Sequence, residues 1–93
     1  MRRIERTKGF KGDYQRVIAT PKHRDLDNLL PAVLMLLATD TPLPAKYLDH
    51  PLRGEWQDFR DCHVKPDLVL IYRNSDNEAL QLVRLGSHSE LGF

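Results

Sequence analysis

The first forty residues place apolar side chains at helical spacing in two successive stretches. In the first stretch, Phe10, Tyr14, Val17 and Ile18 stand at positions i, i+4, i+7 and i+8, which lie on one face of a helix. Pro21 limits this helix, because the residue before a proline avoids helical dihedral angles. The pattern therefore predicts an amphipathic helix that stops before the proline and carries mostly basic side chains on its other face.

The second stretch repeats leucines and one valine at the same spacing from Leu26 to Leu37, and Asp25 is a suitable N-cap. Pro31 removes one backbone hydrogen bond inside this segment. Because the apolar face continues in phase across the proline, we expect one kinked helix rather than a second helix that starts afresh. Two helices joined by about five residues favour an antiparallel pair.

The later part of the chain has the pattern of a β-sheet. The three expected strands contain, in order, Trp56 with Phe59 and Val64, residues 68–72, and residues 79–85. The middle one, LVLIY, is apolar throughout, which is typical of a central strand buried on both faces. Turn-forming residues at 65–67 and 74–77 separate the strands.

These elements predict an α+β fold in which two N-terminal helices pack on a small antiparallel sheet. Residues 3–7 are expected to add a short edge strand. Ninety-three residues provide one modest core, so we expect a single domain that spans residues 1–93. A composition with 41% hydrophobic and 29% charged residues argues against a disordered chain.

The compartment is indicated by cysteine usage and by the N-terminus. The single cysteine, Cys62, excludes an intrachain disulfide and fits a reducing environment. The basic N-terminus lacks the apolar core of a signal peptide, and the longest apolar run, residues 32–38, is too short to cross a bilayer. We therefore expect a cytoplasmic protein without a membrane partner.

The net charge of +1 conceals an uneven distribution. Residues 1–24 contain eight basic and two acidic side chains, whereas residues 25–93 contain six basic and eleven acidic ones, which gives +6 and −5. One interpretation is a solvated basic face. The other is a face for an anionic partner, such as RNA phosphates or an acidic protein segment.

Four side chains able to exchange protons gather around the predicted hairpin, namely His50, His63, Asp67 and His88. His63 ends the first strand of the hairpin and Asp67 begins the second, so the turn between them places both at one rim. His88 follows the third strand, whose end lies near Asp67 if the second and third strands pair antiparallel. Histidine donates or accepts protons near neutrality, and the group therefore indicates an acid–base site.

Other chemistry is also open to these residues. Three histidines and an aspartate are metal-ligand types, but none has the tight HxH or HExxH spacing that places two ligands on one element. Cys62 adjoins His63, and neighbouring strand residues point to opposite faces, so we expect Cys62 in the core rather than as a nucleophile.

The remaining chemistry fits RNA cleavage without a metal or another cofactor. A 2′-hydroxyl attacks the adjacent phosphate while one group takes its proton and another protonates the leaving 5′-oxygen. Basic side chains near the site would stabilise the developing charge, the local candidates being Arg53, Arg60, Lys65 and Arg84. Phe93 either stacks on a base of the substrate or simply packs.

Several segments together carry a family resemblance. HPLRGEW at 50–56, FRDCHVKPDLVLIYR at 59–73, LVRLGSHSELGF at 82–93 and the PLPxxYxDHPL segment at 42–52 closely resemble toxins of the YafQ type in the RelE/ParE superfamily. Each segment alone is a weak signal, but together they are specific. The resemblance implies a compact fold similar to that of microbial ribonucleases.

The resemblance also implies an activity, a set of site residues and partners. The activity is that of a ribosome-dependent endonuclease that cuts mRNA in the decoding A site and halts translation. Its partner is a cognate antitoxin that wraps and neutralises the toxin, and the complex contacts operator DNA and represses its own operon. The positions that match the family's catalytic set are His50, His63, Asp67 and His88. The family also has a phenylalanine shortly after the last histidine; here Gly92 is the fourth residue after His88 and Phe93 the fifth, so Phe93 is the candidate for that role without an established match.

We assign roles on this basis as a hypothesis. His88 is the general acid for the 5′-oxygen, Asp67 or His63 is the base for the 2′-hydroxyl, and His50 orients groups or stabilises charge. Arg60, Lys65 and Arg84 with Phe93 would bind the substrate. Two alternatives remain: a toxin of the same fold that binds another target, such as a topoisomerase, and an inactive module that only binds its antitoxin.

Overall fold

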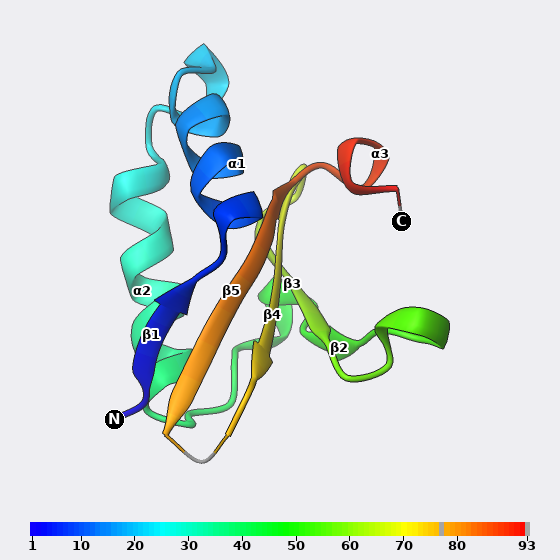
Figure 1. The fold of residues 1–93 in the computed structure, drawn as a ribbon. Coiled ribbons are helices and arrows are strands. Elements are labelled where there is room, and N and C mark those ends of the chain that lie inside the picture. Colours follow the sequence, from blue (N-terminus) through cyan, green and yellow to red (C-terminus); the bar gives the residue numbers. More distant parts are fainter. Residues whose placement is uncertain (77, 93) are drawn as a thin grey trace.

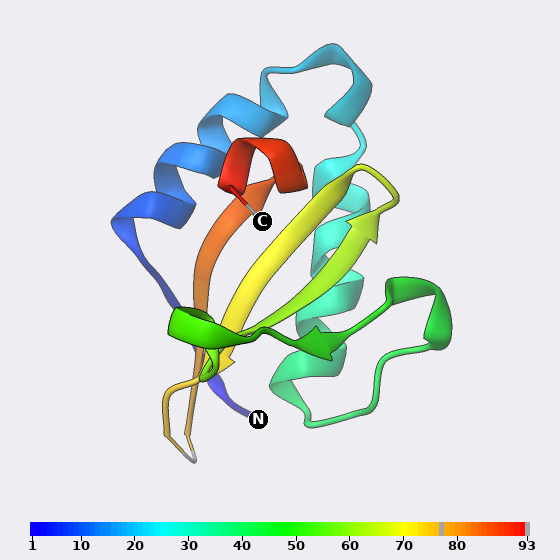
Figure 2. The same cartoon turned by 90° about the vertical axis from the view of Figure 1, so that its right-hand side faces the viewer.

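Two helices cover one face of a five-stranded sheet, and shorter segments lie on the other face (Figures 1 and 2). The structure, a computed structural model, describes residues 1–76 and 78–92. The strands are β1 (Arg3–Arg6), β2 (His50–Pro51), β3 (Arg60–Lys65), β4 (Leu68–Asn74) and β5 (Ala79–Gly86). Their order in the sheet is β1-β5-β4-β3-β2, and the predicted α+β fold is confirmed.

The edge strand differs from the prediction in its direction. β1 pairs with β5 in parallel, whereas the other neighbouring strands are antiparallel. The end of β1 is fixed by Thr7, whose N–H donates to the Leu82 carbonyl at 3.1 Å and whose hydroxyl donates to the Val83 carbonyl at 2.8 Å. The chain therefore enters its first helix directly against β5. Apolar pattern alone does not encode this direction, because it comes from contacts about 75 residues apart in the sequence.

The two predicted helices are present and run antiparallel (Figure 1). The first, α1 (Lys8–Ile18), is capped by Thr7, which accepts a hydrogen bond from the Phe10 N–H at 3.1 Å. The second, α2 (Leu26–Ala38), is one helix with Pro31 inside it. Asp25 occupies the N-cap position of α2 but makes no capping bond, since its carboxylate accepts from Lys65 Nζ at 3.0 Å.

The core lies between the helices and the sheet. It contains Phe10 and Val17 from α1, Leu30 and Val33 from α2, and alternate residues of the three long strands. Cys62 belongs to it and is fully buried, which confirms its expected place in the core, and burial raises the pKa of its thiol. Because strand side chains alternate between faces, the neighbours of Cys62 point to the open face of the sheet.

Two segments differ from their prediction. The first hairpin strand begins at Arg60, because the expected residues from Trp56 belong to a 3₁₀ helix, Gly54–Trp56, and the turn after it. The Trp56 ring packs against that of Phe59 at 5.1 Å between centroids, so these aromatic side chains are stabilised by each other rather than by strand pairing. The expected tail after Gly86 instead forms a short helix, α3 (His88–Leu91).

Within the described ranges, 1–76 and 78–92, none of the helices has the length and apolar character needed to cross a membrane.

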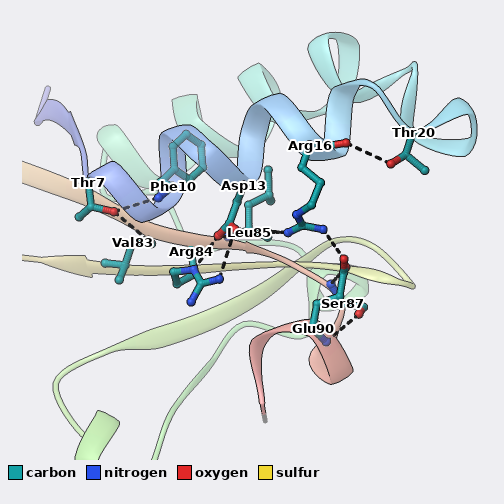
Figure 3. Close-up of polar contacts among 10 residues, drawn as sticks. All are labelled: Thr7, Phe10, Asp13, Arg16, Thr20, Val83, Arg84, Leu85, Ser87 and Glu90. Carbon is teal, nitrogen blue, oxygen red and sulfur yellow. Dashed lines mark hydrogen bonds and ion pairs between the residues drawn. The ribbon is translucent and has the colours of Figure 1, made fainter.

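A buried carboxylate joins α1 to β5 (Figure 3). Asp13 accepts from Arg84 Nε at 2.6 Å, from the Leu85 N–H at 3.0 Å and from Arg16 Nη2 at 3.3 Å. Burial by itself would raise the pKa of the Asp13 carboxyl, but these hydrogen bonds outweigh it and lower the pKa. Since the charged form is favoured in the folded protein, Asp13 stabilises the fold most above the unfolded-state pKa.

We expect Asp13→Asn to lower the free energy of unfolding at pH 7 by about 1–3 kcal/mol, because two arginines lose their charged acceptor. The stabilising effect of Asp13 disappears as the pH falls from about 4 through the lowered folded-state pKa, so the difference between wild type and variant shrinks there. Urea unfolding at pH 7 and pH 3 measures both quantities, with the exposed Glu55→Gln as control. An equal difference at both pH values would contradict this account.

Candidate active site

Three histidines and one aspartate meet on the open face of the sheet because of strand register. β2 pairs with β3 so that His50 stands opposite Asp61. His63 stands opposite Val69 of β4, and Val69 in turn stands opposite Gly86, the last residue of β5. Gly86, where the chain leaves β5, is therefore aligned across the sheet with His63, and His88 follows two residues after Gly86.

The contacts among these side chains are close. His88 Nε2 lies 3.3 Å from Asp61 Oδ2, and His50 Nδ1 lies 3.3 Å from Asp61 Oδ1. The rings of His63 and His88 meet edge to face, with centroids 5.2 Å apart and an interplanar angle of 82°. Asp61 is 1% exposed, whereas His50 and His88 face solvent. The structure thus brings the three predicted histidines together around a carboxylate.

In the rings of His63 and His50, the hydrogen-bond partner of Nδ1 fixes the tautomer. His63 Nδ1 lies 3.3 Å from the Pro66 carbonyl, and His50 Nδ1 lies 2.7 Å from the Leu48 carbonyl. A carbonyl only accepts, so each Nδ1 carries the proton in the neutral ring and Nε2 is left as an acceptor. The Nδ1 proton of His50 points to Leu48, and Asp61 Oδ1 consequently has no hydrogen-bond partner within residues 1–76 and 78–92.

Asp67, the fourth predicted catalytic residue, is placed differently. It lies in the turn between β3 and β4, and its carboxylate forms an ion pair with Lys22 Nζ at 3.1 Å. The hydrogen bond from Lys22 lowers the pKa of the Asp67 carboxyl. Among the interactions found in the described part of the chain, Asp67 has no hydrogen bond or ion pair with the three imidazoles.

The predicted substrate-binding cations are held in ion pairs of the fold. Arg60 contacts the Asp49 carboxylate through Nε and Nη2, both at 3.3 Å. Lys65 reaches the start of α2, where it contacts Asp25, and Arg84 contacts Asp13. Phe93, predicted to stack on a base, lies outside the described residues.

The helix that begins with His88 is held by a compact network (Figure 3). Ser87 and Glu90 form a capping box, with the Glu90 N–H donating to Ser87 Oγ at 3.1 Å and the Ser87 N–H donating to Glu90 Oε1 at 2.9 Å. Glu90 also forms an ion pair with Arg16 of α1. A Cβ at Gly86 would lie 3.3 Å from Arg16 Nη2 and 3.4 Å from Glu90 Oε1, so a side chain there would disturb this network.

Asp61 is the residue that the sequence analysis missed. A signal for it exists, since Asp61 lies two residues before His63 in a predicted strand and therefore points to the same face. Its contacts with His50 and His88 depend on β2 and α3, which were not predicted.

The site also has the donor types of a metal centre. Each of Asp61, His63 and His88 offers one ligand atom, and these three atoms lie within 4.8 Å of one another. Imidazole nitrogens and carboxylate oxygens are common ligands of Zn²⁺ and Cu²⁺. Asp61 Oδ1, which accepts no hydrogen bond from residues 1–76 and 78–92, is a further donor atom that such an ion could use. The residues present therefore fit a transition-metal ion, although the sequence spacing did not suggest one.

Two helices on one face of a mostly antiparallel sheet, with proton-transfer groups on the open face, define a RelE-like toxin domain. Residues 2–92 match the family model described as a bacterial toxin of a type II toxin–antitoxin system, YafQ. The chain belongs to the YafQ family, which confirms the resemblance found in the sequence.

Known proteins agree with this assignment. The mRNA interferase toxin YafQ of Escherichia coli strain K12 is 39% identical over 90 residues, which cover 95% of this chain and 97% of that protein. A crystal structure of the E. coli DinJ–YafQ complex is similar with a TM-score of 0.81 and 39% identity, covering 98% of both chains. A copper-bound variant of a Helicobacter pylori toxin is similar with a TM-score of 0.87 and 38% identity, covering 98% of this chain and 99% of the other.

Proposed function

We propose that this chain, an mRNA interferase by its family, cleaves ribosome-bound mRNA in the decoding A site by acid–base catalysis. The observation that carries the proposal is the contact between His63 and His88, whose rings lie 5.2 Å apart on the open face of the sheet. Two imidazoles this close can serve the two oxygens of one phosphodiester, since one takes a proton while the other gives one.

In the proposed reaction, His63 Nε2 accepts the proton of the 2′-hydroxyl. The 2′-oxygen attacks the adjacent phosphorus, and the bond from phosphorus to the 5′-oxygen breaks. His88 gives its proton to this 5′-oxygen, which leaves a 2′,3′-cyclic phosphate on one fragment and a 5′-hydroxyl on the other. His50 lies on the other oxygen of Asp61, and as an imidazolium, with a proton on Nε2 as well as on Nδ1, it would stabilise the charge that develops on the phosphate oxygens.

The partners follow from the family. A relative forms a complex with an antitoxin, DinJ, and we propose that this chain likewise has an antitoxin that wraps and neutralises it. The complex would repress its own operon through operator DNA, which the toxin would contact only through the antitoxin. The toxin would act in the cytoplasm, where the basic residues of its first 24 positions suit ribosomal RNA or an acidic antitoxin segment.

Mapping mRNA ends tests this proposal. After induction of the toxin, we expect primer extension to show new 5′ ends within codons that occupied the A site, and we expect purified toxin to cut mRNA on ribosomes but not free mRNA. Growth arrest without new mRNA ends would favour the alternative in which the toxin binds another target, such as a topoisomerase. Absence of growth arrest at normal protein levels would favour an inactive antitoxin-binding module.

The metal dependence of cleavage can be measured in the same assay. A transition metal at Asp61, His63 and His88 would supply Lewis-acid chemistry, but it would also bind one ring nitrogen each of His63 and His88, the two side chains that the proposed reaction uses for proton transfer. We therefore expect full activity in 1,10-phenanthroline, which spares the Mg²⁺ of the ribosome, and at least tenfold inhibition by saturating Cu²⁺ or Zn²⁺. Loss of activity in the chelator that added Zn²⁺ restores would overturn metal-independent cleavage.

A further inference from the structure

We infer that Asp61 is a positioning residue for the general acid: its buried carboxylate holds His88 through Nε2 and leaves Nδ1 to deliver the proton. The inference rests on the proposed function, because it assumes that His88 protonates the leaving 5′-oxygen. His88 Nε2 lies 3.3 Å from Asp61 Oδ2. A carboxylate only accepts, so Nε2 must carry a proton for this bond to form.

The surroundings of Asp61 show that this carboxylate is not satisfied by the fold alone. Asp61 is 1% exposed, and it lies beside Cys62 and opposite Ile71, which are both fully buried. Burial of a carboxylate costs several kcal/mol unless hydrogen bonds or charges compensate. Its hydrogen bond among the described residues comes from His88, and Oδ1 has none.

Asp13 provides the contrast within the same molecule. It is also buried, but it accepts hydrogen bonds from two arginines and one backbone N–H, all of them from fixed elements of the fold. Asp13 is therefore satisfied as a structural carboxylate should be. Asp61 instead contacts side chains that face solvent at the proposed site, as expected for a carboxylate that orients a reacting group.

The position of Asp61 also suits this task. It lies on β3, next to the edge strand β2, with His50 directly opposite on β2 and His88 on α3. β3 is paired on both sides, so the carboxylate is carried by a rigid element, whereas α3 has only four residues. The hydrogen bond that His88 donates to Asp61 therefore fixes the ring of His88 more firmly than the short helix does by itself.

A modified substrate distinguishes this role from a purely structural one. We would place a single 5′-bridging phosphorothiolate at the scissile bond of an mRNA in the A site and measure single-turnover cleavage. A thiolate leaves without being protonated, so this substrate does not need the general acid. His88→Gln should lose about 10²–10⁴-fold on the normal substrate and little on the sulfur substrate.

Asp61→Asn should show the same selectivity with a smaller loss. We expect a decrease on the order of 10–100-fold on the oxygen substrate, as for other residues that orient a reacting group, and a rate within about threefold of wild type on the sulfur substrate. Asp58→Asn is a matched control, since Asp58 is exposed and lies three positions away, and it should be unchanged on both substrates.

A second measurement does not depend on whether Asp61→Asn folds. In ¹⁵N-histidine NMR of the wild-type toxin, neutral His88 should be the Nε2–H tautomer. A wild-type His88 in the Nδ1–H tautomer would overturn the inference.

Asp61→Glu keeps the charge of the side chain but moves the carboxylate. This variant should reduce cleavage of the oxygen substrate selectively.

Failure of the inference and failure of the proposed function give different results. Suppose that His88→Gln loses activity on the oxygen substrate and recovers it on the sulfur substrate. If Asp61→Asn is then fully active, or loses activity equally on both substrates, Asp61 does not position the acid. In that case the inference is wrong and the proposed function is unaffected. If His88→Gln cleaves the oxygen substrate at the wild-type rate, the assignment of the acid falls, and the inference falls with it.

Discussion

His88→Gln is expected to slow cleavage of ribosome-bound mRNA by about 10²–10⁴-fold, the usual contribution of a general acid. Glutamine is similar in size and its amide can still donate to Asp61, but it cannot release a proton to the 5′-oxygen. α3 should remain in place, because the capping box of Ser87 and Glu90 does not involve the ring of His88. Single-turnover cleavage with saturating toxin measures the chemical step directly.

The matched control for this variant is Ser89→Ala. Ser89 is the next residue of α3 and is exposed, so its loss should leave the cleavage rate unchanged. Ribosome binding should be the same for wild type and both variants, since the change concerns the reaction and not the docking. Wild-type cleavage by His88→Gln would exclude His88 as the general acid.

His63→Gln should cost about 10²-fold or more in the rate, whereas Asp67→Asn should change it by less than about threefold. The sequence left the base open between these two residues, and the structure gives a reason to choose. His63 contacts the His88 ring, and its Nδ1 contact with the Pro66 carbonyl leaves Nε2 as the proton acceptor of the neutral ring, while Asp67 is paired with Lys22. The hydrogen bond from Lys22 lowers the pKa of the Asp67 carboxyl and makes it a weaker base.

Lys22→Gln provides the control for this comparison. If Asp67 acts only in an ion pair with Lys22, removal of either partner should have the same small effect on cleavage. If Asp67 is the base, Asp67→Asn should abolish activity and Lys22→Gln should leave Asp67 in place and increase its basicity. The rates of the three variants at one pH therefore decide between His63 and Asp67.

Much of the fold could be predicted from periodicity. The apolar face of Phe10, Val17 and their neighbours gave α1, and the continuous face across Pro31 gave α2 as one helix. The LVLIY run gave β4 as a central strand. These predictions succeeded because each depends on residues that are close in the sequence and share one buried face.

The predictions that failed depended on other forces. The segment around Trp56 has strand-forming residues, but a ring contact with Phe59 and the positive φ of 66° at Gly54 place it in a 3₁₀ helix. The direction of β1 is set by pairing with β5, far along the chain. α3 is too short to show a helical period, and its capping box, Ser87 followed by Glu90, was the available signal.

The sequence by itself determined which proton carriers this protein has and that His63 lies on the face opposite Cys62, because strand alternation needs no tertiary contact. It also determined the family, through segments that extend over most of the chain. Only the tertiary structure decided which of these proton-transfer side chains lie close to one another. The register of β2, β3 and β5 brings His50, His63 and His88 around Asp61, while Lys22, from the segment between the helices, pairs with Asp67. These contacts join segments more than ten residues apart, so they depend on strand pairing and packing that no local pattern specifies.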